Sequence, residues 1–569
     1  MKRKIIISLF FLLFIVSCSN IENSERKAKQ YANYEKGSYI NTLPVNDTTI
    51  LNLEVLAKVW GYVKYYHPVF EDSLLNIDYE LFELIPQIVS VQVHERNEIL
   101  CKWIDSLGDF QIDEKEYQRI LEKSVIKVYP STEWIGDTSL IGSNLSEKLL
   151  SIKYAKRKRN NIYVQFTEDG NPIFQKENPY PKITYLDCGY RLLSLLRYWN
   201  IVEYYFPTKY LTTNEWNTLL KKYIPLFITS KTKAEYELAC LRLIAEVSDT
   251  HAYNALISSM MGSNIAPLEL AFIENKIVLS EKYVITGIKI GDEILKINNQ
   301  PVDSIINILR PLTPISNESV FMRDAIGNII RTKKDKIQIT YIGDKQLKDT
   351  VLSCLTLGNY YEKKNIKSKV DQPFKLIGNS IGYINSSSYD KSMFNDLTNK
   401  MQNTKGIIID IRSYPSRDFS KLVKDFFVPK NSVFAKVSAP DKKIPGLFTI
   451  SDGGNNKGNK FNKKYKNKIV ILVNEYTQSY AEFMTMALQS APNSIVIGSA
   501  TAGADGNVSH LQLPGNISTL FSALGIYYPN DQVAQRIGIS IDEIVKPTVD
   551  GLIKGLDEVL DRAVEILTK

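Results

Sequence analysis

The chain has 569 residues, of which 44% are hydrophobic and 23% are charged. This composition is ordinary for a folded protein of roughly three or four domains, and it excludes disordered and collagen-like chains. Lys and Arg number 70 against 62 Asp and Glu, and so small a surplus does not indicate a nucleic-acid partner. The five Cys include no C-x-x-C pair and only four His occur, so we expect neither a metal site nor a cofactor.

The N-terminus has the pattern of a lipoprotein signal sequence. A basic start, residues 2–4, precedes a stretch at 5–16 that is apolar apart from one Ser and too short to span a bilayer. It ends in Ile-Val-Ser-Cys, which resembles a bacterial lipobox with Cys18 as the lipidated residue. We therefore expect a membrane-anchored lipoprotein of the bacterial cell envelope, on the periplasmic face or the cell surface. An ordinary signal peptide with a chance Cys is the alternative.

Two segments of the N-terminal half resemble each other. LAKVWGYVKYYHP at 56–68 matches LLRYWNIVEYYFP at 195–207. In both segments apolar and aromatic residues recur at helical spacing, and each segment ends at a Pro, where a helix must stop. We therefore expect a duplicated helical unit with Trp60 and Trp199 in its core.

Further along, the copies differ in a way that points to function. Asp249-Thr250-His251 in the second copy corresponds to Asp109-Phe110-Gln111 in the first. A duplication that keeps the scaffold but not the imidazole indicates that His251 has a role which the scaffold does not need. Between the copies, residues 112–185 have a strand-like pattern, with a hairpin expected at Asp169-Gly170.

Residues 266–302 alternate apolar and polar residues in short stretches, which predicts a β-rich segment. Within it, GIKIGDEILKINNQPV at 287–302 resembles a PDZ domain of the bacterial protease type, and the resemblance extends over 270–355. PDZ domains bind extended peptides by strand addition beside a helix, so the resemblance implies a peptide-binding module. A domain that braces the catalytic core without binding substrate is the alternative.

From residue 360 onward, apolar strands alternate with helices, which predicts a buried, largely parallel sheet. Four segments in this region resemble the tail-specific, or C-terminal processing, serine peptidases. They are KGIIIDIRSYPS at 405–416, IVILVNEYTQSYAEFMTMAL at 469–488, IVIGSATAGADGNV at 495–508 and GISIDEIVKPTVDG at 538–551. With the PDZ-like part and the segment around His251, the resemblance covers about 190–569, in the family's order.

The resemblance implies a multidomain α/β fold, with a PDZ-like β domain beside a catalytic core of the tail-specific protease (ClpP/crotonase-like) type. The N-terminal part would be the duplicated helical region. The expected divisions are a signal peptide at 1–17, a tether at 18–45, a helical unit plus β-rich segment at 46–185, a second helical unit at 186–265, the PDZ-like domain at 266–358 and the catalytic domain at 359–569.

Ser479 is the nucleophile that the resemblance implies, because it lies three residues before Glu482 as the family's Ser precedes its Glu. Its expected place at a helix N-terminus suits a developing negative charge, since free N–H groups gather there. A Ser that merely caps the helix is the alternative. The oxyanion hole would use the backbone N–H groups of Ser413 and Tyr480, although the family usually has Gly at the position of Ser413.

The general base differs between two branches of the family. The Lys branch expects Phe-Gly-Lys-Gly after the nucleophile, but this chain has Ala-Gly-Ala-Asp-Gly at 502–506. The branch that resembles the tricorn core protease expects a His just before the PDZ domain, which is the place of His251. His510, on a strand expected after the nucleophile, is a rival base.

The third member of the catalytic group should be a carboxylate, but its position holds Gln535. A Gln can orient an imidazole through a hydrogen bond but cannot stabilise its positive charge. Gln535 is the expected orienting residue, with Glu482 and Asp249 as substitutes.

These patterns together predict a serine endopeptidase of the cell envelope that cleaves peptide bonds in proteins or peptides. We expect its partners to be these substrates and, through the N-terminal lipid, a membrane, while no pattern indicates an oligomeric state. The alternative is a catalytically weak or inactive relative that binds peptides or protein C-termini, because Ser413 and Gln535 depart from the family. An α/β-hydrolase esterase is excluded, since Ser479 lacks the flanking Gly residues of a nucleophile elbow.

Overall fold

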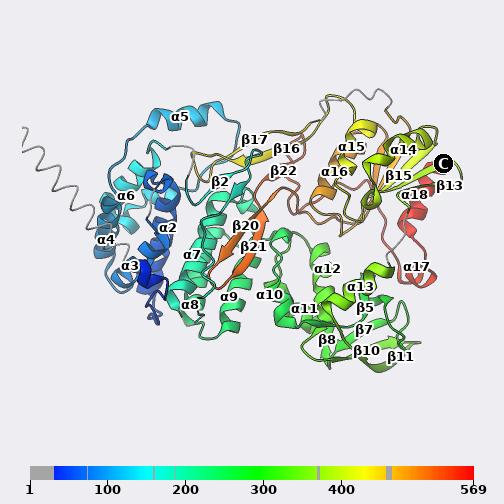
Figure 1. Cartoon of the computed structure of the whole chain (residues 1–569), viewed down its shortest axis with the longest axis horizontal. Helices are drawn as coiled ribbons and strands as arrows, with labels where there is room; N and C mark the ends of the chain where they lie inside the picture. The colour runs from blue at the N-terminus through cyan, green and yellow to red at the C-terminus, as the bar shows by residue number, and fades with distance from the viewer. Residues whose placement is uncertain are drawn as a thin grey trace, which may run out of the picture.

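The computed structural model describes residues 31–72, 75–157, 161–182, 184–185, 187–367, 372–455 and 464–569. The expected signal peptide and Cys18 lie outside these residues. Figure 1 shows a helical region on the left, a small β domain at the lower right and an α/β core at the upper right. No helix in the described ranges is long and apolar enough to cross a membrane.

The helical region contains two similar units, as the internal repeat predicts. The first has α2 (Asp47–Tyr66), α3 (Ile77–Ile88) and α4 (Val93–Ser106), and the second has α7 (Cys188–Tyr205), α8 (Leu219–Thr229) and α9 (Lys233–Ala245). Trp60 donates its indole N–H to the carbonyl of Ile77 at 2.8 Å, and Trp199 donates to the carbonyl of Trp216 at 3.0 Å, 17 residues later in both units. Both Trp side chains are buried. The duplication is therefore confirmed down to individual hydrogen bonds.

The segment between the two units differs from the prediction. Residues 112–185 were expected to be strand-like, but most of their regular structure is helical: α5 (Glu114–Lys123) and α6 (Thr138–Lys153), with the short strands β1 (Ile126–Val128), β2 (Gln165–Phe166) and β3 (Pro172–Ile173). In α6 the buried residues Ile141, Leu145, Leu149 and Ile152 recur at helical spacing. This spacing explains why the segment forms a helix, and the expectation of strands is wrong here. The hairpin at Asp169-Gly170 is confirmed, because β2 and β3 pair antiparallel.

The small β domain has a sheet with strand order β11-β10-β7-β6-β5. These strands are β5 (Leu268–Ile273), β6 (Lys276–Lys282), β7 (Glu293–Ile297), β10 (Lys336–Gly343) and β11 (Gln346–Ser353), and β8 (Gln300–Pro301) pairs with β7. A second, three-stranded sheet combines β4 (Asn264–Ile265), β9 (Arg331–Thr332) and β12 (Leu355–Thr356). The helices are α10 (Leu256–Met261), α11 (Val302–Leu309), α12 (Glu318–Ile329) and α13 (Leu357–Lys367).

The α/β core has the predicted sheet, in the order β13-β14-β15-β18-β19-β23. Only β13 (Phe374–Ile377) is antiparallel to its neighbour, and the parallel strands are β14 (Ile381–Asn385), β15 (Gly406–Asp410), β18 (Lys468–Val473), β19 (Ser494–Gly498) and β23 (Glu543–Ile544). Alternate strand residues face opposite layers: Ile407 and Ile409 pack with α14 (Phe394–Met401) and α16 (Tyr480–Gln489), while Ile408 packs with α18 (Glu558–Thr568). The short helices α15 (Phe419–Leu422) and α17 (Val549–Lys554) complete the core.

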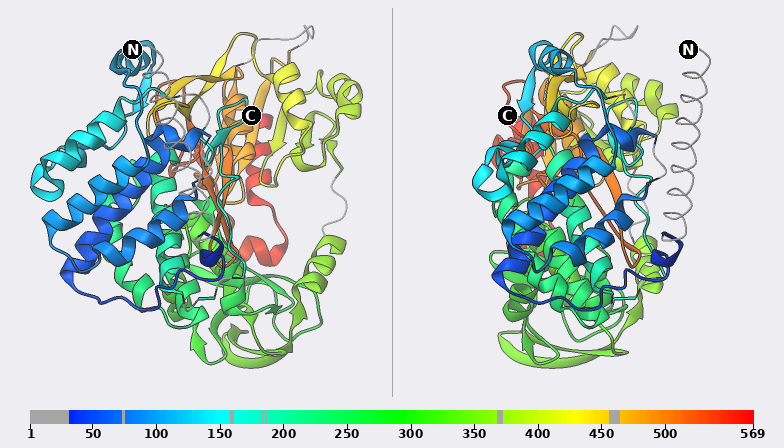
Figure 2. Two further views of the ribbon diagram at one scale, coloured as in Figure 1. Left: turned by 60° about the vertical axis from the view of Figure 1, so that its left-hand side comes forward. Right: turned by 90° about the vertical axis from the view of Figure 1, so that its left-hand side faces the viewer.

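Two β elements connect the core with the helical region. One is an antiparallel sheet of order β1-β17-β16-β22, with β16 (Val433–Pro440), β17 (Phe448–Asn455) and β22 (Gly525–Tyr527) from the core. The other is the hairpin of β20 (Val508–Leu513) and β21 (Ile517–Ser522), drawn in orange against α7 and α9 in Figure 1. Its side chains Leu511, Leu513, Ile517 and Phe521 belong to the same apolar core as α2 and α7. The hairpin therefore fixes the helical region to the α/β core. In Figure 2 these two parts lie side by side above the small β domain.

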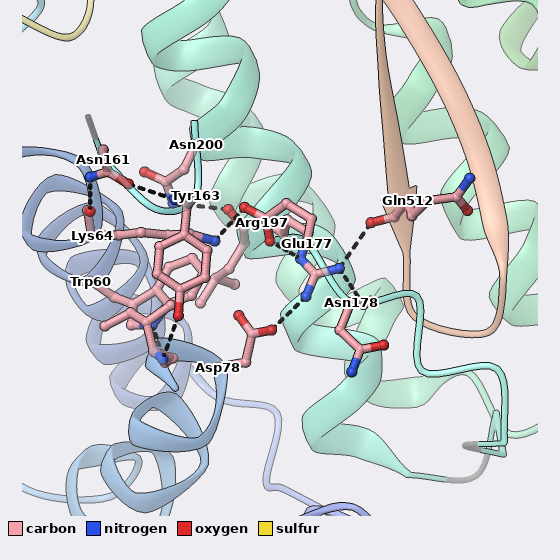
Figure 3. A network of polar contacts seen from close by, with 12 residues as sticks. Trp60, Lys64, Asp78, Asn161, Tyr163, Glu177, Asn178, Arg197, Asn200 and Gln512 are labelled. Carbon is pink, nitrogen blue, oxygen red and sulfur yellow. Dashed lines mark hydrogen bonds and ion pairs between the residues drawn. The ribbon is translucent and has the colours of Figure 1, made fainter. Parts of the chain in front are cut away.

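A buried cluster of charges anchors this hairpin (Figure 3). Arg197 of α7 contacts Asp78 at 2.6 Å and Glu177 at 2.8 Å, and Lys64 of α2 contacts Glu177 at 2.5 Å. Arg197 also donates to the backbone carbonyl of Gln512 in β20 at 2.9 Å. The two positive and two negative side chains compensate each other's charge inside the protein, away from solvent. Burial nevertheless lowers the pKa of Lys64.

Candidate active site

Ser479 is the residue immediately before α16, at the end of the loop that follows β18. Its backbone has φ 57° and ψ −122°. An ordinary N-cap residue is extended, whereas a positive φ costs a residue with a side chain free energy. Its N–H donates to the carbonyl of Ala504 at 2.9 Å and to the carboxylate of Glu482 at 3.2 Å. This forced conformation distinguishes Ser479 from a plain helix cap.

Glu482 holds the neighbouring loop against α16. Its buried carboxylate accepts hydrogen bonds from the Thr501 hydroxyl at 2.6 Å and from the N–H groups of Gly503 and Ala504 at 2.8 and 3.0 Å. Burial raises the pKa of Glu482, although these hydrogen bonds act in the opposite direction. Because both of its oxygens are used in this way, Glu482 is a structural residue of the loop and does not orient His251 in the structure.

The two expected oxyanion donors lie on neighbouring segments. The Thr477 hydroxyl donates to the carbonyl of Ile411 at 3.0 Å, and the rings of Tyr414 and Tyr480 have centroids 6.2 Å apart, so the turn after β15 packs on the loop before α16. Toward the described residues, the backbone N–H groups of Ser413 and Tyr480 make no hydrogen bond. Ser413 has a negative φ, so its position does not require the Gly that the family usually has.

Arg412 connects the turn after β15 to two carboxylates. Its guanidinium contacts Asp410, at the end of β15, at 2.6 Å and Asp557, before α18, at 2.8 Å. A guanidinium that binds two carboxylates restricts the backbone on either side of it. The turn that carries Ser413 is therefore attached to both Asp410 and Asp557 through Arg412.

His251 comes from the second helical unit, in a single turn of 3₁₀ helix after α9. Its Nδ1 lies 2.8 Å from Oγ of Ser522, the last residue of β21, and 3.6 Å from Oδ1 of Asp249. Burial alone would raise the pKa of Asp249, but the interactions with His251 and the N–H of Ser522 outweigh it and lower this pKa. The carboxylate is therefore ionised at neutral pH.

One loop and the hairpin that follows it connect the two residues. Ala504 accepts the Ser479 N–H, and Asn507, where the loop ends, accepts from the N–H of Ala523 at 2.8 Å. Ala523 follows Ser522, the partner of His251. The side chains of His251 and Ser479 are not joined by a hydrogen bond in the described structure, and such bonds commonly form only with substrate present.

The other two expected residues lie elsewhere. Gln535 is buried, but the position beside Nδ1 of His251 is taken by Ser522, and Gln535 Nε2 has no hydrogen-bond partner among the described residues. His510 pairs with Leu520 across the hairpin, and its side chain is exposed to solvent. Among the described residues, no hydrogen bond joins the side chain of either residue to that of His251 or Ser479.

Ser522 is the residue that sequence reasoning missed. It lies 271 positions from His251, at the end of a strand with no motif that marks it. The register of β20 and β21 could have placed it beside the loop at 502–506, but only the docking of the second helical unit brings an imidazole to it.

The arrangement is suited to acyl transfer. This chemistry needs a nucleophile, backbone N–H donors and a general base. Ser479 lies in a strained turn at a helix N-terminus, the N–H groups of Ser413 and Tyr480 are unpaired among the described residues, and the His251 imidazole lies near an ionised carboxylate. Within the described ranges, no group of three or more His, Cys, Asp or Glu residues is placed to hold a metal ion.

Comparison with known proteins identifies the core. Residues 380–545, which include the parallel sheet, the turn at Ser413 and Ser479, match peptidase family S41. The match lies within the α/β core, so this part of the chain is similar to the family S41 peptidases. No curated protein matches the chain.

Solved structures of CPAF share the fold. The chain is similar to mature CPAF complexed with lactacystin, with 12% identity and a TM-score of 0.53 over 67% of this chain and 98% of that one. Mature CPAF itself gives 13% identity and a TM-score of 0.52 over the same shares. The photosystem II D1 C-terminal processing protease gives 14% identity and a TM-score of 0.38 over 64% of this chain and 97% of that chain. The likeness to CPAF extends beyond the family match to about two thirds of the chain, and at this identity it is a likeness of fold.

Proposed function

We propose that this chain, whose core matches peptidase family S41, is a serine endopeptidase that hydrolyses peptide bonds in proteins or peptides, with Ser479 as nucleophile and His251 as general base. The observation that carries the proposal is the backbone conformation of Ser479, which a helix cap does not need. The contact of His251 with the hairpin beside the nucleophile loop supports it further.

The proposed reaction follows from these groups. Nε2 of His251 takes the Ser479 proton as Oγ attacks the peptide carbonyl, and the N–H groups of Ser413 and Tyr480 stabilise the negative oxygen of the tetrahedral intermediate. His251 then gives this proton to the leaving amine. A water molecule, activated by the same imidazole, hydrolyses the acyl-enzyme and frees Ser479.

Covalent labelling by a fluorophosphonate probe tests this proposal, because only an activated serine reacts. We expect one label per chain, on the peptide that contains Ser479, and none in Ser479→Ala. Ser490→Ala is the matched control: Ser490 lies at the other end of α16, where its hydroxyl bonds the Ala487 carbonyl, and this variant should label like the wild type. A folded wild-type chain that neither labels nor hydrolyses unfolded casein would instead support the inactive, peptide-binding reading.

The small β domain is proposed to bind substrate by strand addition. Strand β5 is an edge of its sheet, and α12 packs against it, which is the pairing of edge and helix that peptide binding of this kind uses. Arg323 of α12 donates to the carbonyl of Glu475 at 2.9 Å and to the side chain of Gln478 at 3.0 Å. A peptide on this edge would therefore lie near the loop that carries Ser479.

Competition by peptides tests this role without disturbing the fold. Peptides with a free C-terminus should inhibit casein cleavage more strongly than the same peptides with an amidated C-terminus if the domain recognises the carboxylate. Equal inhibition by both would rule out carboxylate recognition and leave strand addition through the backbone.

We also propose that the enzyme works at the cell envelope, held to the membrane by a lipid on Cys18. The support is the sequence of the first 18 residues alone.

A further inference from the structure

Nδ1 of His251 is surrounded by groups from two distant parts of the chain. Oγ of Ser522 lies 2.8 Å away, at the end of β21, and Oδ1 of Asp249 lies 3.6 Å away, two residues before the His itself. Ser522 and Asp249 are both buried, whereas the imidazole is partly exposed. The protein therefore encloses the Nδ1 side of a ring that is not fully buried.

Asp249 holds this arrangement together. Its Oδ2 accepts the backbone N–H of Ser522 at 2.6 Å, and its Oδ1 accepts the backbone N–H of His251 at 3.1 Å. One carboxylate thus fixes the end of the hairpin and the 3₁₀ turn relative to each other. Because the ring and its hydroxyl partner are both attached to Asp249, Ser522 meets Nδ1 at a set distance and direction.

These contacts select the useful form of the imidazole. An ionised carboxylate near Nδ1 and a hydroxyl oxygen that can accept a hydrogen bond both favour a proton on Nδ1. Nε2 then has its lone pair free for the Ser479 proton, and the positive charge that forms on the ring lies beside a negative one.

We propose that Ser522 and Asp249 are the positioning residues of His251, and that together they take the place of the carboxylate which is absent at Gln535. Ser522 supplies the hydrogen bond that orients the ring, and Asp249 supplies the charge. The inference rests on the proposed function, because it assigns roles around the same base.

Saturation kinetics with a fluorophosphonate separate this role from a structural one. The maximal inactivation rate reports activation of Ser479, and the half-saturating probe concentration reports binding. Ser522→Ala should lower the maximal rate by about 10- to 100-fold with little change in half-saturation, as the loss of one orienting hydrogen bond does. Asp249→Asn should lower it further, by about 10³-fold or more, and Ser522→Thr, which keeps the hydroxyl, should recover most of the Ser522→Ala loss.

Ser509→Ala is the matched control. Ser509 is a buried serine of the same hairpin, and its hydroxyl donates to the Pro172 carbonyl, away from His251. It should lose stability to urea as Ser522→Ala does but keep the wild-type inactivation rate. Equal maximal rates in Ser522→Ala and Ser509→Ala, or a loss in Ser522→Ala confined to half-saturation, would overturn the proposal.

The two levels of inference fail differently. If the wild type does not label, or if labelling persists in Ser479→Ala, the proposed function is wrong. If the wild type labels at Ser479 and Ser522→Ala labels at the same rate, only the positioning roles are wrong.

Discussion

Asn200 occupies the space where Gly61 would carry a side chain: a Cβ built on Gly61 would lie 1.8 Å from Asn200 Oδ1. The two residues hold corresponding positions in the repeated units, so α2 and α7 cross at the same point of each copy. Asn200 is fixed there by hydrogen bonds to the carbonyls of Ala57 and Leu196, at 3.0 and 2.9 Å. The two units are thus packed as related halves of one body, and the crossing requires a Gly in one of them.

Gly61→Ala tests this crossing. The added methyl cannot fit unless Asn200 moves and gives up buried hydrogen bonds, so we expect the free energy of unfolding to fall by about 1–3 kcal/mol. Urea unfolding measures it. Gly358→Ala, in α13 with no atom within 4 Å of the added methyl, should leave stability unchanged or raise it slightly. Equal effects of the two variants would contradict the close crossing.

The buried charge cluster makes a second prediction. Arg197→Met leaves the carboxylates of Asp78 and Glu177 with only one positive partner, Lys64, and removes a hydrogen bond to the hairpin. We expect a loss of about 3–5 kcal/mol in the free energy of unfolding, because an uncompensated buried charge remains. The same substitution at Arg562, whose ion pair with Glu543 is solvent-accessible, should cost far less.

His67 predicts how stability depends on pH. Burial lowers the pKa of His67 to about 4 from an ordinary value of 6.5, so below pH 6.5 the unfolded chain binds a proton that the folded chain does not. Stability from this residue is therefore complete above pH 6.5 and is lost as the pH falls toward 4, by about 2 kcal/mol between pH 8 and pH 5. The second copy has Phe206 in this place, so His67→Phe should fold and should lose this part of the pH dependence.

Urea midpoints at pH 8 and pH 5 check this expectation. His94→Gln is the control, because the His94 side chain is exposed and its replacement should leave the pH dependence as in the wild type. An unchanged difference between the two midpoints in His67→Phe would show that other groups cause the acid destabilisation.

Replacement of the base distinguishes the two candidate imidazoles. His251→Ala should reduce casein hydrolysis by about 10³-fold or more, with little loss of stability, as removal of one member of a catalytic triad does. His510→Ala should have little effect, because the His510 side chain is exposed on β20. Near-full, Ser479-dependent activity in His251→Ala would contradict the assignment.

Lipidation can be tested by fractionation. The wild type, expressed with its own N-terminus in a bacterial host, should partition into the detergent phase of a Triton X-114 separation, because a lipid chain adds buried apolar surface. Cys18→Ala should move to the aqueous phase, and Cys101→Ala, which changes a buried Cys of α4, should partition like the wild type. Cys18→Ala that stays with membranes would argue for another anchor.

The sequence by itself determined much of the fold, and it singled out Ser479 as the candidate nucleophile. Buried parallel strands such as Gly406–Asp410 are continuous apolar runs, and the repeat around Trp60 and Trp199 preserves side chains that the core needs, so both features are visible in one dimension. The sequence pattern did not predict α6. In this helix four buried apolar residues at helical spacing lie among small polar residues and a Gly, which weakens the helical pattern.

Only the tertiary structure decided which groups contact the His251 imidazole. Asp249 is close to His251 in sequence, but Ser522 meets Nδ1 because the hairpin of the core packs into the helical region, against α7 and the buried charges of Arg197. No local sequence pattern predicts such a contact, since it depends on how the hairpin and the helical region pack together. Gln535 is buried with its amide nitrogen unpaired among the described residues, and its role as an orienting residue stays a prediction.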